Sequence, residues 1–217
     1  MHAPTAFRVN DTAELVAFIE ARHFATLVVA GPDGPLAAHV PMLVNRDADG
    51  AVISLECHVA RNNPVVAIAA SGAKALAIFN GADAYVTPSL YLSKREHGKV
   101  VPTWNYIAVE VTGDVVTFND APSLTAQIER MTDAMEQPTA VPWKVSDAPD
   151  AYIAQMLNGI TGLRLTVGGI EGVRKISQNK NAGDFAGVLN GFTHSNDHGA
   201  RELAAEMTKS DIVKKVS

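Results

Sequence analysis

Residues 24–59 read FATLVVA-GPDG-PLAAHVPMLV-NRDADG-AVISLECHV, and this stretch decides the fold. Three short apolar runs are separated by two short polar stretches that contain Gly, Asp and either Pro or Asn, which is typical of antiparallel hairpins. A doubly wound parallel sheet needs a helix between successive strands, and no helical pattern separates these runs. We therefore predict antiparallel strands in this part of the chain.

The pattern extends to both sides of this stretch. Apolar positions at helical spacing predict a helix from Asp11 to about His23, and Asn63 followed by Pro64 predicts a short helix that ends at Gly72. Further strands are expected at residues 75–80, 84–88, 102–119 and 160–176, and the third of these is either one strand or two joined at Gly113. Further helices are expected at residues 120–136, 146–158, 177–192 and 197–217. Six or more short strands with few helices between them predict a closed or half-open antiparallel barrel.

Length and composition limit the kind of protein. The 217 residues suffice for one substantial core, and 47% apolar and 19% charged residues are ordinary for a globular chain. We expect one domain, residues 1–192, followed by a helical tail, residues 193–217. The net charge of −5 argues against a basic face that binds nucleic acid.

The single cysteine and the hydropathy pattern set further limits. Cys57 cannot form an intramolecular disulfide or complete a multi-cysteine zinc site, and its apolar surroundings predict a buried, inert thiol. No apolar run approaches the length of a membrane span and no leader begins at Met1, so we expect a cytoplasmic protein. We expect no metal site, because carboxylates do not cluster beside the histidines and no HExxH motif is present. No GxSxG nucleophile motif occurs either.

The segment CHVARNNP, residues 57–64, is the first candidate for a binding site. It runs from a strand end into a helix start, where free backbone N–H groups attract anions, and Arg61 can contact a phosphate with two N–H groups. The alternative is structural: Asn63 caps the helix, while His58 and Arg61 are partly exposed residues at a strand end. The residues alone leave both interpretations open.

The second candidate is the stretch YVTPSLYLSKREHGKVVPTWNY, residues 85–106. Ring surfaces beside polar donors are what a planar, charged ligand needs. The alternative is an ordered loop whose rings fill the edge of the core. The candidate contacts are the rings of Tyr85, Tyr91 and Trp104 and the polar side chains of Ser93, Lys94, His97, Lys99 and Thr103.

Two further features have both a functional and a structural interpretation. The cationic run RKISQNK, residues 174–180, can contact a phosphate or a ring, or it can be a solvated connector, as most charged runs are. His39 lies on an alternating strand and faces either a pocket or a core niche that satisfies its nitrogen atoms. These patterns identify no catalytic residue.

Together, these segments resemble a known family, the PaiB-like proteins, described as FMN-binding negative transcriptional regulators. The matching residues are HVP at 39–41, HVARNNP at 58–64, the whole of 85–106, WKVSDAP at 143–149 and KISQN at 175–179. The resemblance covers residues 1–192, and the long central motif is its most specific part.

The resemblance implies a mainly β fold, namely a six-stranded antiparallel split β-barrel of the FMN-binding type with flanking helices, related to pyridoxamine phosphate oxidase and the flavin reductases. It also implies a homodimer with two FMN sites at the subunit interface. The implied cofactor-binding residues are His58, Ala60, Arg61 and Asn62 at the phosphate and His39 beside the isoalloxazine. Further implied contacts are Lys175 and Gln178, together with Trp104, which comes from the partner subunit.

The chain departs from the family pattern at the last motif. Arg174 stands where family members commonly have Trp, and Lys180-Asn181 replaces the usual Arg-Pro. These departures affect the C-terminal contact to the flavin ring and leave the phosphate segment intact.

Three functions remain after the resemblance is considered. The first is an FMN-binding negative transcriptional regulator that acts through flavin binding or redox, because the net charge and the lack of a helix-turn-helix pattern argue against direct contact with DNA. The second is a flavin-dependent oxidoreductase of the pyridoxamine phosphate oxidase or flavin reductase type. The third is a haem-binding or haem-degrading split barrel, with His97, His194 or His198 as axial ligand.

Overall fold

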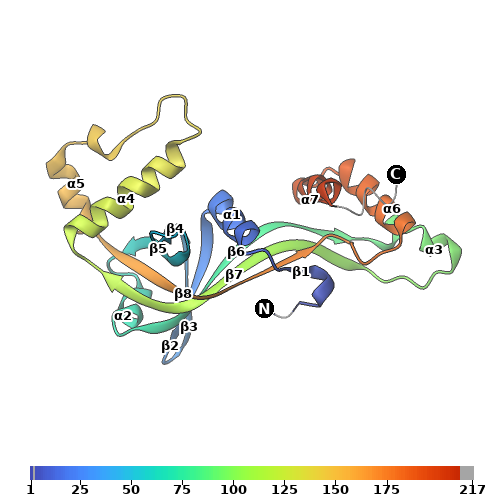
Figure 1. The fold of residues 1–217 in the computed structure, drawn as a ribbon, viewed down its shortest axis with the longest axis horizontal. Helices are drawn as coiled ribbons and strands as arrows, with labels where there is room; N and C mark the ends of the chain where they lie inside the picture. Colours follow the sequence, from blue (N-terminus) through green and yellow to red (C-terminus); the bar gives the residue numbers. More distant parts are fainter. Residues whose placement is uncertain (2, 211–217) are drawn as a thin grey trace. The chain divides into compact units, whose positions relative to one another are not determined.

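The computed structural model describes residues 1 and 3–210 (Figure 1). Its strands are β1 (Arg8–Val9), β2 (Phe24–Gly31), β3 (Gly34–Pro41), β4 (Leu43–Arg46), β5 (Val52–Ala60), β6 (Ala73–Val86), β7 (Thr103–Phe118) and β8 (Ile160–Lys175). Its helices are α1 (Thr12–Arg22), α2 (Pro64–Ala69), α3 (Ser93–Glu96), α4 (Ala121–Glu136), α5 (Asp150–Leu157), α6 (Ala182–Thr193) and α7 (His198–Lys209). Short 3-10 turns occur at Thr5–Phe7, Pro88–Leu90 and Val145–Asp147.

The strands join in one sheet with the order β3-β2-β6-β7-β8-β5-β4, and β1 pairs with β8. The pairs β2–β3, β2–β6, β4–β5, β5–β8 and β1–β8 are antiparallel. This confirms the predicted mainly β, antiparallel class with flanking helices.

The predicted number of six strands was wrong, because the described residues form eight. The run predicted as one strand at residues 35–44 divides at Met42 into β3 and β4. The strand β1 has two residues, which is too short to show any alternation. The two runs predicted at 75–80 and 84–88 are instead one strand, β6, of 14 residues.

Gly113 does not break β7, which is one strand of 16 residues. A Cβ atom at Gly113 would lie 1.8 Å from the backbone oxygen of Thr166 on β8. The glycine therefore permits a close approach of two backbones, and a turn is not required there.

The contacts of the chain form two compact units. One contains residues 13–79 and 110–170. Its core follows from alternation: Leu55, Cys57 and Val59 of β5 are buried, while the residues between them lie on the other face of the strand. Helix α2 packs on β2 and β3, and β3 packs on β5. Helix α4 packs on α5.

Two helices of this unit begin as their sequences predict. The side chain of Asn63 accepts a hydrogen bond from the Val65 N–H at 3.1 Å and caps α2. Asp120 accepts one from the Ser123 N–H at 2.9 Å and caps α4. Both caps satisfy amide groups that a helix start leaves without intrahelical partners.

The other unit contains residues 1–12, 80–109 and 171–217, of which the structure describes all but 2 and 211–217. Helices α6 and α7 lie side by side (Figure 1). The carboxylate of Asp184 on α6 accepts hydrogen bonds from the backbone N–H (2.9 Å) and the hydroxyl (2.8 Å) of Ser93. The boundary expected after residue 192 stays a prediction, and the last seven residues of the expected tail lie outside the described residues.

No helix in the described part of the chain is both long enough and apolar enough to cross a membrane.

Candidate functional site

The segment from His58 to Asn62 lies where β5 ends and the chain turns into α2. Ala60 is the last residue of β5, and Arg61 and Asn62 form the turn. The backbone holds this turn, because the Arg61 N–H donates to Gly159 and the Asn63 N–H donates to Ala60, each at 2.9 Å. The side chains of Arg61 and Asn62 are consequently exposed at a fixed place.

This turn presents several free hydrogen-bond donors. Arg61 donates one hydrogen bond, from Nη2 to the backbone oxygen of Ile160 at 3.0 Å. Within residues 1 and 3–210, its other N–H groups, the Asn62 amide and the Asn62 backbone N–H form no hydrogen bond. Helix α2 has only six residues, so its dipole is small and these donors carry the attraction for an anion.

His58 is half-buried beneath helix α4. Its Nδ1 lies 2.8 Å from Oε1 of Gln127, a residue of α4 that is 0% exposed. Because an amide oxygen only accepts, Nδ1 carries the hydrogen in this contact. The Gln127 Nε2 is buried and has no hydrogen-bond partner among the described residues. Sequence reasoning missed Gln127, although a glutamine between Leu124 and Met131 on the buried face of a helix was a usable signal.

His39 lies on β3 and is exposed, so of the two alternatives left open by the sequence, the core niche does not apply. Its Nδ1 is 3.1 Å from the hydroxyl of Thr26, its neighbour across the β2–β3 pair. Because β3 packs on β5, His39 belongs to the same unit as His58. No hydrogen bond joins His39 to residues 58–62 in the described structure.

Trp104 belongs to the other unit, on β7. Trp104 is 51% exposed, as is Tyr85 on β6, and the two rings meet edge to face with centroids 5.9 Å apart. Such a pair leaves aromatic surface open for stacking. Tyr91, a third predicted stacking surface, is 2% exposed and instead contacts the ammonium of Lys180, 4.6 Å from its ring centroid.

Lys175 and Gln178 belong to the same unit as Trp104. Lys175 Nζ donates to the Thr103 hydroxyl at 2.7 Å, and burial, followed by the charge of Lys180, lowers the pKa of Lys175. Gln178 accepts from the Ile176 N–H at 2.7 Å and donates to the backbone oxygens of Ala6 and Arg174. Its amide is therefore committed to the backbone.

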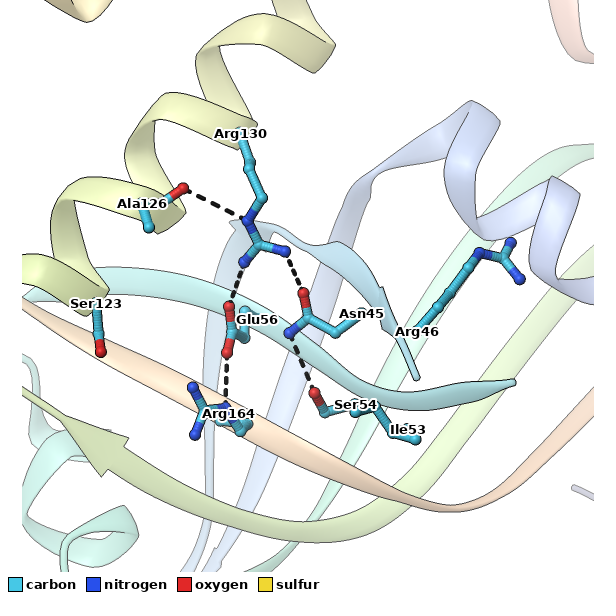
Figure 2. A pocket seen from close by; sticks show the side chains of 9 residues that line it. All are labelled: Asn45, Arg46, Ile53, Ser54, Glu56, Ser123, Ala126, Arg130 and Arg164. Carbon is cyan, nitrogen blue, oxygen red and sulfur yellow. Dashed lines mark hydrogen bonds and ion pairs between the residues drawn. The ribbon is translucent and has the colours of Figure 1, made fainter. Parts of the chain in front are cut away.

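A cavity of about 430 Å³ lies under α4, and no part of it was predicted from the sequence (Figure 2). Its buried carboxylate is Glu56, two residues before His58 on the same face of β5. Glu56 Oε2 accepts from Arg130 Nη2 on α4 at 2.5 Å, and Oε1 accepts from Arg164 Nε on β8 at 2.6 Å. Burial raises the pKa of Glu56, but the hydrogen bonds of Arg164 and Asn45 and both arginine charges outweigh it, so the pKa lies below its ordinary value.

Comparison with known proteins gives a family and relatives. The model of the family described as "Putative FMN-binding domain" matches residues 1–168. The chain is 29% identical to "Protease synthase and sporulation protein PAI 2" of Bacillus subtilis over the full length of both. It is 32% identical to an uncharacterized protein of Emericella nidulans, over 77% of this chain and 79% of that protein.

Solved structures give the fold. The flavocytochrome Anf3 of Azotobacter vinelandii is similar with a TM-score of 0.60, at 10% identity, over 80% of this chain and 72% of that chain. An FAD and haem binding protein of Mycobacterium smegmatis is similar with a TM-score of 0.56, at 14% identity, over 77% and 73%. At such identities the likeness shows the split-barrel fold alone.

Proposed function

The chain belongs to the PaiB-like family of FMN-binding domains, and we propose that it holds the phosphate of FMN at the turn between β5 and α2. FMN is the cofactor that the family description names, which agrees with what the resemblance in sequence implies. Under this proposal Arg61 and Asn62 donate to the phosphate, while the backbone at Ala60 lets it approach closely.

One observation carries the proposal: the free donors of Arg61 and Asn62 are fixed at an exposed turn in which no carboxylate occurs. A guanidinium with two adjacent free N–H groups matches the oxygen atoms of a phosphate. His58 adds a ring whose orientation Gln127 fixes. The donor set therefore fits the phosphate end of FMN.

The ring of FMN requires an apolar wall, and we assign this role to the exposed pair Tyr85 and Trp104 of the partner subunit, contributed together across a homodimer interface. The cation of Lys175 is partly desolvated, donates to the Thr103 hydroxyl and lies over the Phe7 ring, and it adds a positive charge to that wall. When bound, FMN supplies electron transfer, and the protein residues hold and orient it.

We assign the chain a regulatory role in the cytoplasm that works through its flavin. The name of the B. subtilis relative, protease synthase and sporulation protein, supports a regulatory role. The net charge of −5 supports flavin-dependent action over direct contact with DNA. A gel shift of the promoter region at physiological salt that disappears when Lys94, Arg95 and Lys99 are neutralised would contradict the indirect role.

The first test of the cofactor is the visible spectrum of the purified protein and the identity of the released chromophore. We expect a yellow protein that releases FMN, or a colourless one that takes up added FMN. A Soret band would favour the haem-binding alternative, and a colourless protein that does not bind added FMN would refute the cofactor proposal.

Arg61→Ala tests the phosphate contact. We expect FMN affinity to fall by roughly 10–100-fold, as for loss of a charge-assisted hydrogen bond, measured by quenching of flavin fluorescence. Arg201→Ala is the matched control, because Arg201 is also exposed and also donates one hydrogen bond to a backbone oxygen, that of Ser195 at 2.8 Å. Equal FMN affinities for the two folded variants would rule out the role of Arg61.

A further inference from the structure

The cavity under α4 is rich in donors and poor in acceptors. Three guanidinium groups line it, those of Arg46, Arg130 and Arg164, against one carboxylate, Glu56. Both oxygens of Glu56 accept hydrogen bonds from arginines. Arg46 pairs with Glu20 at 2.8 Å and donates to the backbone oxygen of Gly50. The single carboxylate of the lining is therefore fully used, and further arginine N–H groups stay available to an added acceptor.

Arg164 is the best placed of the three. Its Nε is held by Glu56, and its guanidinium lies over the ring of Phe118, with Cζ 5.2 Å from the ring centroid. Among the described residues, neither of its terminal nitrogens forms a hydrogen bond. Figure 2 shows these two nitrogens beyond the Glu56 contact. The guanidinium is thus fixed in place. Its edge with the two terminal nitrogens, Nη1 and Nη2, stays free and can bind an oxyanion with two parallel hydrogen bonds.

Other donors and acidic groups complete the surroundings. Arg130 is oriented by three contacts: Nε donates to the Ala126 oxygen, Nη1 to Asn45 and Nη2 to Glu56. Asp120 is a nearby carboxylate that already accepts hydrogen bonds from Ser123. These hydrogen bonds, and to a lesser extent the charge of Arg164, lower its pKa. No lining group other than Glu56 carries a negative charge.

We propose that this cavity binds a small molecule through an oxyanion group, a carboxylate or a phosphate, held by the free edge of Arg164 and by Arg130. The volume of about 430 Å³ suits a small metabolite. The site does not depend on the assignment of the FMN phosphate, which uses Arg61 and Asn62 beyond the end of β5.

Two probes distinguish the two classes of oxyanion. Succinate and inorganic phosphate are titrated separately into the purified full-length protein by calorimetry at low, matched ionic strength. Saturable binding of either probe supports the site and identifies the class. Absence of binding by both overturns the proposal.

Two variants locate the binding. Arg164→Gln removes the charge, and we expect roughly tenfold weaker binding or a complete loss. Ala126→Phe fills the cavity without removing a charged group, and we expect it to abolish binding. The controls are Arg201→Gln, and Ala121→Phe at an exposed position of α4 that does not line the cavity. If folded Arg164→Gln and Ala126→Phe bind the probe like the wild type, the assignment to this cavity is wrong.

The FMN affinity of Arg164→Gln separates this site from the flavin site. We expect it to equal that of the wild type. A loss of FMN binding like that expected for Arg61→Ala would show that the cavity belongs to the flavin site and would overturn the proposal of a separate one. A different result would separate the two proposals. If neither the wild type nor any variant binds FMN while succinate or phosphate still binds, the proposed function is refuted and the oxyanion site stands.

Discussion

Cys57 is completely buried on the inner face of β5, beside the charged Glu56. Burial, followed by the charge of Glu56, raises the pKa of the thiol to about 12. Because the thiolate is the reactive form, we expect no alkylation of the folded protein by iodoacetamide at about pH 8 and complete alkylation in denaturant, measured by mass spectrometry. Stoichiometric labelling under native conditions would contradict this burial.

Glu56 makes stability depend on pH. Its pKa is lower in the folded chain than in the unfolded one, so the unfolded chain takes up its proton first as the pH falls. Its contribution to stability is therefore complete above the unfolded pKa, near 4.5, and is lost as the pH falls through the lower folded value.

The variant Glu56→Gln tests this residue. At neutral pH we expect it to lower the free energy of unfolding by about 1–3 kcal/mol, because it leaves two half-exposed arginines without their carboxylate. Urea titrations at several pH values should show the difference from the wild type shrinking below the ordinary carboxyl pKa. A difference that is constant from neutral to acidic pH would exclude the charge as its cause.

At the scale of elements, α6 packs closely against the segment that precedes α3. A Cβ atom at Gly187 would lie 2.0 Å from the backbone oxygen of Leu90, whereas one at Gly183 would meet the flexible end of the Leu92 side chain at 2.9 Å. We expect Gly187→Ala to destabilise the protein by about 1–3 kcal/mol and Gly183→Ala to be near neutral, since Ala favours a helix by roughly 1 kcal/mol. Equal stability of the two variants in urea unfolding would contradict this packing.

The elements were more predictable than the contacts between them. Apolar runs between turn residues give β2 and β5, and alternation gives β8. The capping residues Asn63 and Asp120 mark two helix starts. These signals are all local in sequence. The division at Met42 follows Pro41, which has no N–H for strand pairing and was a usable local signal. The site was predicted only in part, because Glu56 meets Arg130 and Arg164, which lie 74 and 108 residues away in sequence. Contacts of that kind depend on strand register and on how a helix docks.

At the scale of the whole molecule, the proposed homodimer places Trp104 at an interface. The chain has two tryptophans, Trp104 and Trp143, and both are about half exposed in a single chain. In Trp143→Phe, Trp104 is the single emitter, and we expect iodide to quench it less as the protein concentration rises and dimers form. Molar mass from light scattering follows the same transition and should reach twice 23.0 kDa. A monomer at all concentrations would refute the dimer.

The two contacts between α4 and β5 also bear on how faithfully the sheet assembles. Gln127 and Arg130 stand one helical turn apart, and they meet His58 and Glu56, which share one face of the strand. If β5 paired with β8 one residue out of register, His58 and Glu56 would turn into the core, and Leu55 and Cys57 would face the polar side chains of the helix. Misregistered chains would thus bury a charge without its partner, and the contacts with α4 therefore favour the observed pairing over a pairing shifted by one residue.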